Sequence, residues 1–131
     1  MRPGTTPPRT DDGSAVVEFV LVSVLVLVLL LGVVQVALAM HVRSIATDAA
    51  AEGARVAARA DRGPADGVAR TRDLLTGALT GAYARDVTAG RTALGGVPVA
   101  EVTVRTPLPV VGLLGPGGTM TVRGHALVEE P

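Results

Sequence analysis

The sequence predicts an α+β fold, with a long N-terminal transmembrane helix that continues into a stalk, a short second helix and a small antiparallel sheet. Three observations predict it. Residues 19–40 are almost wholly apolar, residues 41–60 repeat apolar side chains every three or four positions, and two C-terminal segments alternate apolar with polar residues. The length of 131 residues allows one small domain beside a membrane segment.

The apolar segment, residues 19–40, is long enough to cross a membrane. Its 22 residues would span about 33 Å as a helix, against about 30 Å for a hydrocarbon core. Only Ser23 and Gln35 are polar, and no residue is charged. The segment is rich in valine, but a lone strand in lipid leaves its backbone groups unpaired, so we predict a helix.

Three interpretations of this segment compete. It is a secretory signal cut after the Ala-Leu-Ala at 37–39, an uncleaved anchor, or a segment cut just before the apolar run and retained in the membrane. A signal core is usually 7–15 residues long and follows positive charge, whereas this run is longer and follows Asp11, Asp12 and Glu18. The length and the charges favour the third interpretation, with residues 1–13 as a polar leader.

The edge of the apolar run reads Gly13-Ser14-Ala15-Val16-Val17-Glu18-Phe19 and places a carboxylate at the membrane boundary. Glu18 either reaches the lipid headgroups as an ordinary flanking charge or compensates a positive charge. A cut between Gly13 and Ser14 would create an α-amino group four residues before Glu18. That amine could pair with Glu18 of the same chain or of a neighbour, and would then fix the register between subunits.

These residues resemble the TadE-like family, pseudopilins of tight-adherence (Flp-type) pilus systems. The resemblance rests on Gly13, on Glu18 and Phe19 opening the span, and on the Ala-rich helix and strands that follow. It implies a pilin-like fold and a prepilin peptidase that cuts between Gly13 and Ser14. Ser14 would then be first, where pilins of the broader type IV class often begin with Phe.

The resemblance also implies a structural, non-enzymatic role as a minor component in assembly of a pilus or related secretion apparatus. It places the chain in a bacterial cytoplasmic membrane as a single-pass protein, with a cytoplasmic N-terminus and an extracytoplasmic C-terminal domain. The implied partners are membrane lipid, prepilin peptidase, and other pilins or pilus-assembly proteins that contact the N-terminal helix.

Helical character continues beyond the apolar segment, because alanine favours helices and residues 41–60 carry an apolar stripe. We predict one helix over residues 14–60, with the stripe at Val42, Ile45, Ala49, Gly53, Val56 and Ala60. Ala49, Gly53 and Ala57 also form a line of small residues. This line either packs closely on the chain's own head domain or associates with another subunit.

The predicted head domain comprises residues 64–131. Gly63 and Pro64 break the first helix, and residues 65–83 form a shorter one that Gly77 and Gly81 weaken. Residues 87–89 are a weak strand, and the alternating segments 99–106 and 119–129 pair as antiparallel strands. The apolar loop 107–115 either folds over the sheet or docks on a membrane or a partner.

The sequence offers no constellation of catalytic residues and no basis for a cofactor, a metal site or a small-molecule substrate. Cysteine is absent, and His41 and His125 belong to no ligand-spaced cluster. The formal net charge of zero and the scarcity of aromatic residues give no indication of nucleic-acid binding. The alternative function is a bitopic membrane anchor whose small extracytoplasmic domain binds a partner unrelated to pili.

Overall fold

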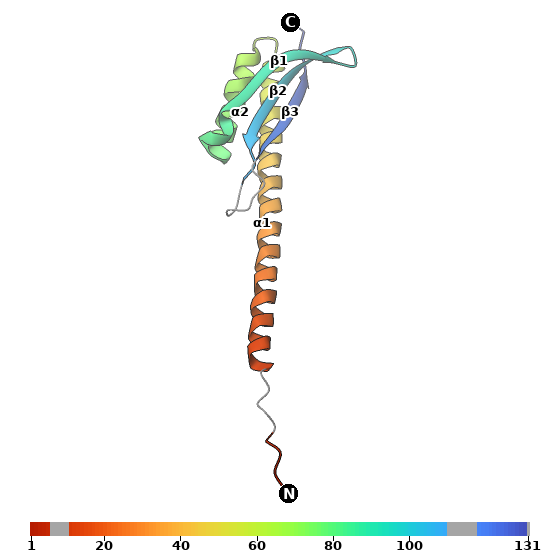
Figure 1. Cartoon of the computed structure of the whole chain (residues 1–131). Coiled ribbons are helices and arrows are strands. Elements are labelled where there is room, and N and C mark those ends of the chain that lie inside the picture. Colours follow the sequence, from red (N-terminus) through yellow and green to blue (C-terminus); the bar gives the residue numbers. More distant parts are fainter. Residues whose placement is uncertain (6–10, 110–117, 131) are drawn as a thin grey trace. The chain divides into compact units, whose positions relative to one another are not determined.

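The first helix, α1, spans Asp11–Ala58 and contains the whole apolar segment. A computed structural model describes residues 1–5, 11–109 and 118–130 of the chain. The chain divides into two units, Met1–Val34 and Gln35–Pro131. The first unit contains the N-terminal part of α1, and the second contains the C-terminal part of α1 with all the other elements (Figure 1).

The second unit contains a three-stranded antiparallel sheet, which together with the helices confirms the predicted α+β fold class. Its strands, β1 (Asp86–Leu94), β2 (Val97–Pro107) and β3 (Thr119–Leu127), lie in the order β1-β2-β3. The antiparallel pairing of the last two strands is as predicted, with Val102 opposite Gly124. β1 is much longer than the strand predicted over residues 87–89, because pairing with β2 extends it through Gly90 to Leu94.

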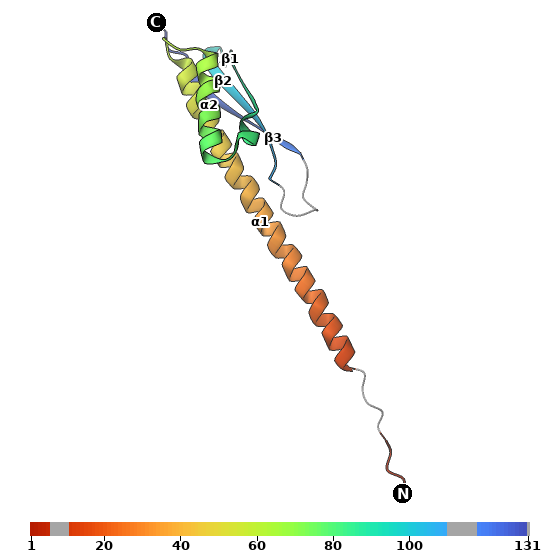
Figure 2. The ribbon, with the colours of Figure 1, turned by 90° about the vertical axis from the view of Figure 1, so that its left-hand side faces the viewer.

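The core lies between one face of the sheet and the two helices of the second unit. Figures 1 and 2 show the strands on one side of the C-terminal part of α1, with α2 (Pro64–Ala78) running beside it. Val102 and Val104 of β2 are completely buried in a cluster that also includes Leu75 of α2 and Ala46, Ala50 and Ala54 of α1. The inward positions of β2 follow the alternation in the sequence.

The buried face of α1 differs from the predicted stripe. Val42, Ala49 and Gly53 are buried as predicted, but Ile45 and Val56 are half-buried and Ala60 is exposed beyond the end of the helix. The remaining buried positions are all alanines: Ala46, Ala50, Ala54, Ala57 and Ala58. Small side chains let the helix lie close to both the sheet and α2, so the buried face is wider than a single stripe.

The connection from α1 to α2 contains the residues that start the second helix. α2 begins at Pro64, and the Gly63 N–H donates to the Asp66 carboxylate at 2.9 Å, which satisfies a donor at the start of the helix. The predicted helix over 65–83 is too long. α2 ends at Ala78, and a separate 3₁₀ turn, η1, covers Gly81–Ala84, in keeping with the weakening effect of Gly77 and Gly81.

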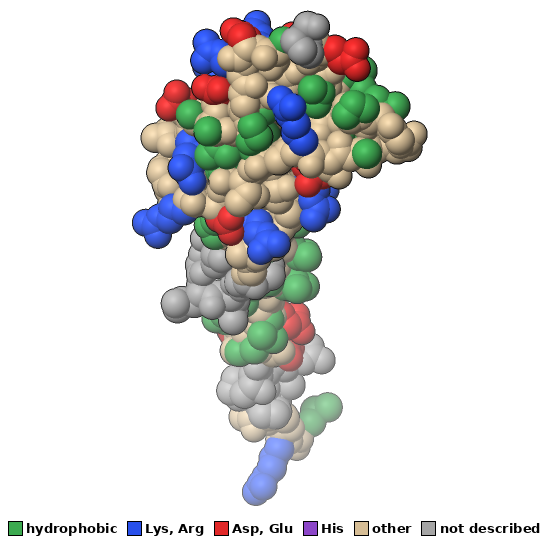
Figure 3. Space-filling model, turned by 90° about the horizontal axis from the view of Figure 1, so that it is seen from above, with side chains coloured by type: hydrophobic (Ala, Val, Ile, Leu, Met, Phe, Trp, Pro, Cys, Tyr) green, Lys and Arg blue, Asp and Glu red, His purple; other side chains and the backbone are tan. Residues whose placement is uncertain are grey.

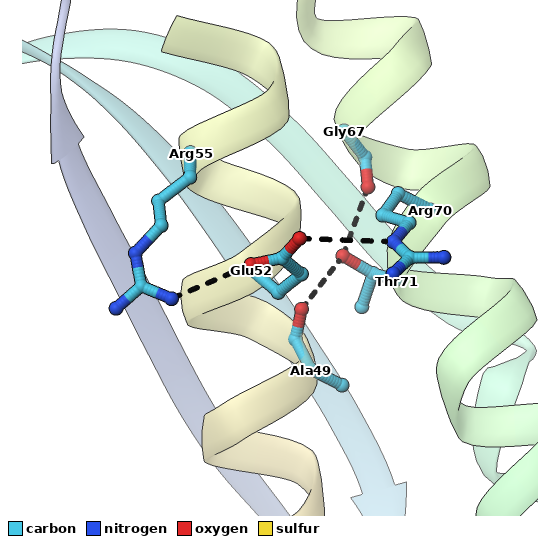
Figure 4. A network of polar contacts seen from close by, with 6 residues as sticks. All are labelled: Ala49, Glu52, Arg55, Gly67, Arg70 and Thr71. Atoms are coloured by element: carbon cyan, nitrogen blue, oxygen red, sulfur yellow. Dashed lines mark hydrogen bonds and ion pairs between the residues drawn. The ribbon is translucent and has the colours of Figure 1, made fainter.

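The line of small residues packs inside the second unit. A Cβ added at Gly53 would lie 2.8 Å from the Gly67 carbonyl oxygen, and one added at Gly67 would lie 2.7 Å from the Gly53 carbonyl oxygen. The Thr71 hydroxyl sits at this crossing, 2.9 Å from the Gly67 carbonyl oxygen and 3.2 Å from that of Ala49 (Figure 4). Of the two interpretations of the line, the structure supports close packing on the chain's own head.

The apolar loop predicted over residues 107–115 lies largely outside the described residues. Its base is described: the Leu108 N–H donates to the Gly118 carbonyl oxygen at 2.9 Å, next to the last pair of the β2–β3 ladder, Pro107 and Thr119. The two interpretations of the loop therefore stay as predictions.

Candidate functional site

The residues that flank the predicted cut lie in the first turn of α1. The helix begins at Asp11, three residues before the predicted start, and Asp11 and Asp12 place negative charge at its N-terminus, where the helix dipole favours it. Gly13 and Ser14 are exposed, and a Cβ added at Gly13 would meet nothing within 4 Å. First-turn N–H groups have no partner within the helix, so this turn unwinds at the loss of few hydrogen bonds.

Glu18 and Phe19 follow in the second and third turns of α1. Both are exposed, Phe19 by 73%, and Glu18 takes part in no ion pair among the described residues. Residues four apart on a helix are neighbours on one face, so Ser14 and Glu18 lie one turn apart on the same side. The helix thus brings all four predicted residues together at one end of the apolar surface.

The apolar surface beyond Phe19 is not covered by the rest of its unit. Every large apolar side chain from Val16 to Val34 is exposed. Among the described helices, α1 is the one long and apolar enough to cross a membrane. An exposed apolar surface of this extent is stable in lipid or against other apolar helices, not in water. α1 is therefore suited to single-pass anchoring in a membrane.

The polar groups of the head form small structural contacts. Glu52 lies between Arg55, at 3.4 Å, and Arg70 of α2, at 3.9 Å, and links the two helices (Figure 4). His125 and Glu101 lie 2.7 Å apart on the outer face of the sheet. These partly exposed pairs stabilise the head only slightly.

Among the described residues of the head, the charged groups do not form a recognisable ligand site. Acidic and basic side chains are interspersed over the face of the head that Figure 3 shows. No group of three His, Asp or Glu side chains within residues 1–5, 11–109 and 118–130 is placed to hold a metal ion.

Sequence reasoning missed two residues that matter for the architecture. Gly67 allows α2 to approach α1, and Gly124 allows β3 to do so: a Cβ at Gly124 would contact the backbone of Ala50 and Ala51. A signal was present, because glycine inside a strand often marks a close backbone approach. Gly124 interrupts an otherwise regular alternation between Val122 and Ala126.

Comparison with known proteins places the family resemblance on this same region. Residues 13–55 match the model of the family described as TadE-like protein, so the match begins at Gly13 and includes Glu18 and the apolar segment. It confirms the predicted resemblance to this family of structural pilus components. The matched region covers about a third of the chain and ends before α2. No curated protein and no solved structure gives a significant match.

Proposed function

We propose that this protein is a TadE-like pseudopilin, a minor structural component that takes part in assembly of a tight-adherence type pilus or a related secretion apparatus. The observation that carries the proposal is Glu18 at the edge of the exposed apolar part of α1, in a segment that matches the TadE-like family from Gly13 onward. The family associates the chain with a pilus system and a membrane. The pseudopilin role is the finer statement that we add.

The proposed maturation is a cut by a prepilin peptidase between Gly13 and Ser14. Two observations support it: Gly13 has no side chain beside the scissile bond, and both residues are exposed in a first helical turn that unwinds readily. The cut would remove the aspartates at the start of α1 and leave the Ser14 α-amino group at the new helix end. Residues 1–13 are then a leader, residues 14–58 the long helix, two residues shorter at its C-terminal end than predicted, and residues 64–131 the head.

The proposed role of Glu18 follows from the new amine. In lipid a carboxylate is expensive without a positive partner. The Ser14 amine of the same chain lies one turn away, and the amine of a neighbouring chain is the competing partner. Pairing between chains would place their apolar helices side by side in one register, as buried polar pairs do in coiled coils. Other pilins or pilus-assembly proteins would be the neighbours.

The proposed placement is a bacterial cytoplasmic membrane, with the N-terminus cytoplasmic and the head extracytoplasmic. The peptidase site and the helix that bears Glu18 would then lie at the cytoplasmic face, while the sheet and α2 would lie outside. In this proposal the head, whose core consists mainly of alanine and valine, has a structural role.

Deletion of the gene in its own host tests the proposed role. We expect the deletion strain to lack surface pili or secretion by the matching apparatus, and the full chain supplied in trans to restore it. Electron microscopy of cells and a surface-attachment assay measure the outcome. A deletion strain with normal pili, attachment and secretion would contradict the proposal and favour a bitopic anchor for an unrelated partner.

A further inference from the structure

The β1–β2 hairpin of the head ends in an exposed apolar tip. Gly95 and Gly96 form its two-residue turn with φ values of +57° and +84°, a conformation that favours glycine. Leu94 and Val97 flank the turn as a register pair and are 51% and 47% exposed. β3 ends at Leu127, opposite Val99, so the hairpin extends beyond the third strand. We call residues 91–98 the hairpin arm.

A groove between α1 and α2 lies elsewhere on the same unit. It has a volume of about 470 Å³, and its lining includes Ile45, Asp48, Ala49, Glu52, Leu74 and Ala78. The α1 wall carries both carboxylates and Arg55, and the α2 wall is apolar. Glu52 already contacts Arg55 and Arg70, whereas Asp48 makes no ion pair with any described residue. We call it the α1–α2 groove.

The two faces of the hairpin arm match the two walls of this groove. Side chains alternate along a strand, so Arg91 lies on one face of the arm and Leu94 lies on the other, together with Val97. Within the described part of the chain, Arg91 makes no ion pair. The arm therefore offers an available cation and an apolar edge, and the groove offers an available carboxylate and an apolar wall. In one copy the arm points away from α2 (Figure 1).

We infer that the hairpin arm of one copy of this chain occupies the α1–α2 groove of a second copy. Arg91 then pairs with Asp48 on the α1 wall, and Leu94 and Val97 pack against Leu74 and Ala78 on the α2 wall. The two contacting surfaces differ, so the contact is head-to-tail and can continue from copy to copy. A contact of this small area is weak between free proteins, and it becomes effective where membrane helices concentrate the copies. It requires neither cleavage at Gly13 nor the charge of Glu18.

Disulfide crosslinking between two full-length variants tests the contact, and the absence of native cysteine makes the result clean. Cells produce one tagged copy with Leu94→Cys and a differently tagged copy with Ala78→Cys, an exposed position on the α2 wall of the groove, and their membranes are oxidised. We expect a crosslink that carries both tags. A crosslink formed mainly between two Leu94→Cys copies would overturn the proposal in favour of a symmetric hairpin contact, and no crosslink at all would also overturn it.

Charge exchange provides the second arm of the test. Either Arg91→Glu or Asp48→Arg should lower the yield of the mixed crosslink about fivefold to tenfold, and the two together, one on each copy, should restore it. Arg123→Glu, an exposed arginine on β3 outside the arm, is the matched control and should leave the yield unchanged. Equal losses from Arg91→Glu and Arg123→Glu, or no rescue, would contradict the pairing.

The crosslink is also measured in the Glu18→Gln background, which separates this contact from the proposed function. We expect the mixed crosslink to persist there. Its absence in both backgrounds would remove the hairpin contact and leave the proposed role of Glu18 intact. If the mixed crosslink forms but the deletion strain still makes normal pili, the hairpin contact stands and the proposed function is contradicted.

Discussion

Glu18→Gln is expected to abolish or severely reduce assembly of the pilus apparatus, with roughly tenfold or more fewer pili per cell. The substitution keeps the size and hydrogen-bonding capacity of the side chain but removes the charge that would pair with the Ser14 amine of a neighbour. In lipid a neutral amide is less costly than a carboxylate, so membrane insertion should be unchanged or slightly improved. Pilus counts and the amount of protein in the membrane fraction measure the two effects.

The controls for Glu18 separate a charge effect from a folding effect. Glu18→Asp keeps the carboxylate on a shorter side chain and should retain part of the assembly. Glu130→Gln makes the same chemical change at an exposed position in the C-terminal tail and should be neutral. Normal pili in Glu18→Gln, with full membrane insertion, would show that Glu18 is an ordinary flanking charge.

Gly124→Ala is expected to destabilise the head by about 3 kcal/mol. The added methyl group would contact the α1 backbone at Ala50 and Ala51, with the Ala50 carbonyl oxygen only 2.5 Å away. A helix backbone cannot move aside without disturbing its own hydrogen bonds or the packing of α1 on the sheet. For a unit of this size, we expect a fall in midpoint temperature on the order of 10–20 °C. Thermal unfolding of the full chain in detergent, with proteolysis of the head as the readout, measures the midpoint temperature.

Gly90→Ala is the matched control for Gly124→Ala. Gly90 also lies within a strand, but a Cβ there would meet nothing within 4 Å. The methyl group should therefore leave stability unchanged or raise it slightly, since alanine restricts the unfolded chain more than glycine does. Similar midpoints for the two variants would contradict the close approach of β3 to α1.

The elements that the sequence predicts best are the long apolar segment and the two strands in which apolar and polar residues alternate. The apolar segment 19–40 has no charge, so its place within α1 follows from hydropathy alone. β2 and β3 alternate apolar with charged or hydroxyl side chains over most of their length, so their inward faces and pairing are also predictable. At the N-terminus, Gly13, Glu18 and Phe19 ahead of an Ala-rich helix carried the resemblance to the TadE-like family, whose model matches residues 13–55.

The remaining features depend on contacts that one segment of sequence does not contain. Alanine occurs on several sides of the C-terminal part of α1, so the pattern cannot distinguish Ala46 and Ala50 from exposed positions. β1 contains Gly90, Arg91 and Thr92, which weaken the strand pattern, and its full length follows from pairing with β2. The reciprocal approach of Gly53 and Gly67 requires both helices to be present.

The identity of the mature N-terminal residue tests the proposed function most directly. The full chain is produced in cells that contain the matching prepilin peptidase, isolated from their membranes, and analysed by mass spectrometry or Edman degradation. The account predicts Ser14 as the first residue, with residues 1–13 removed. Met1 as the first residue would contradict it in favour of a plain anchor, and Met40 would contradict it in favour of a secretory signal.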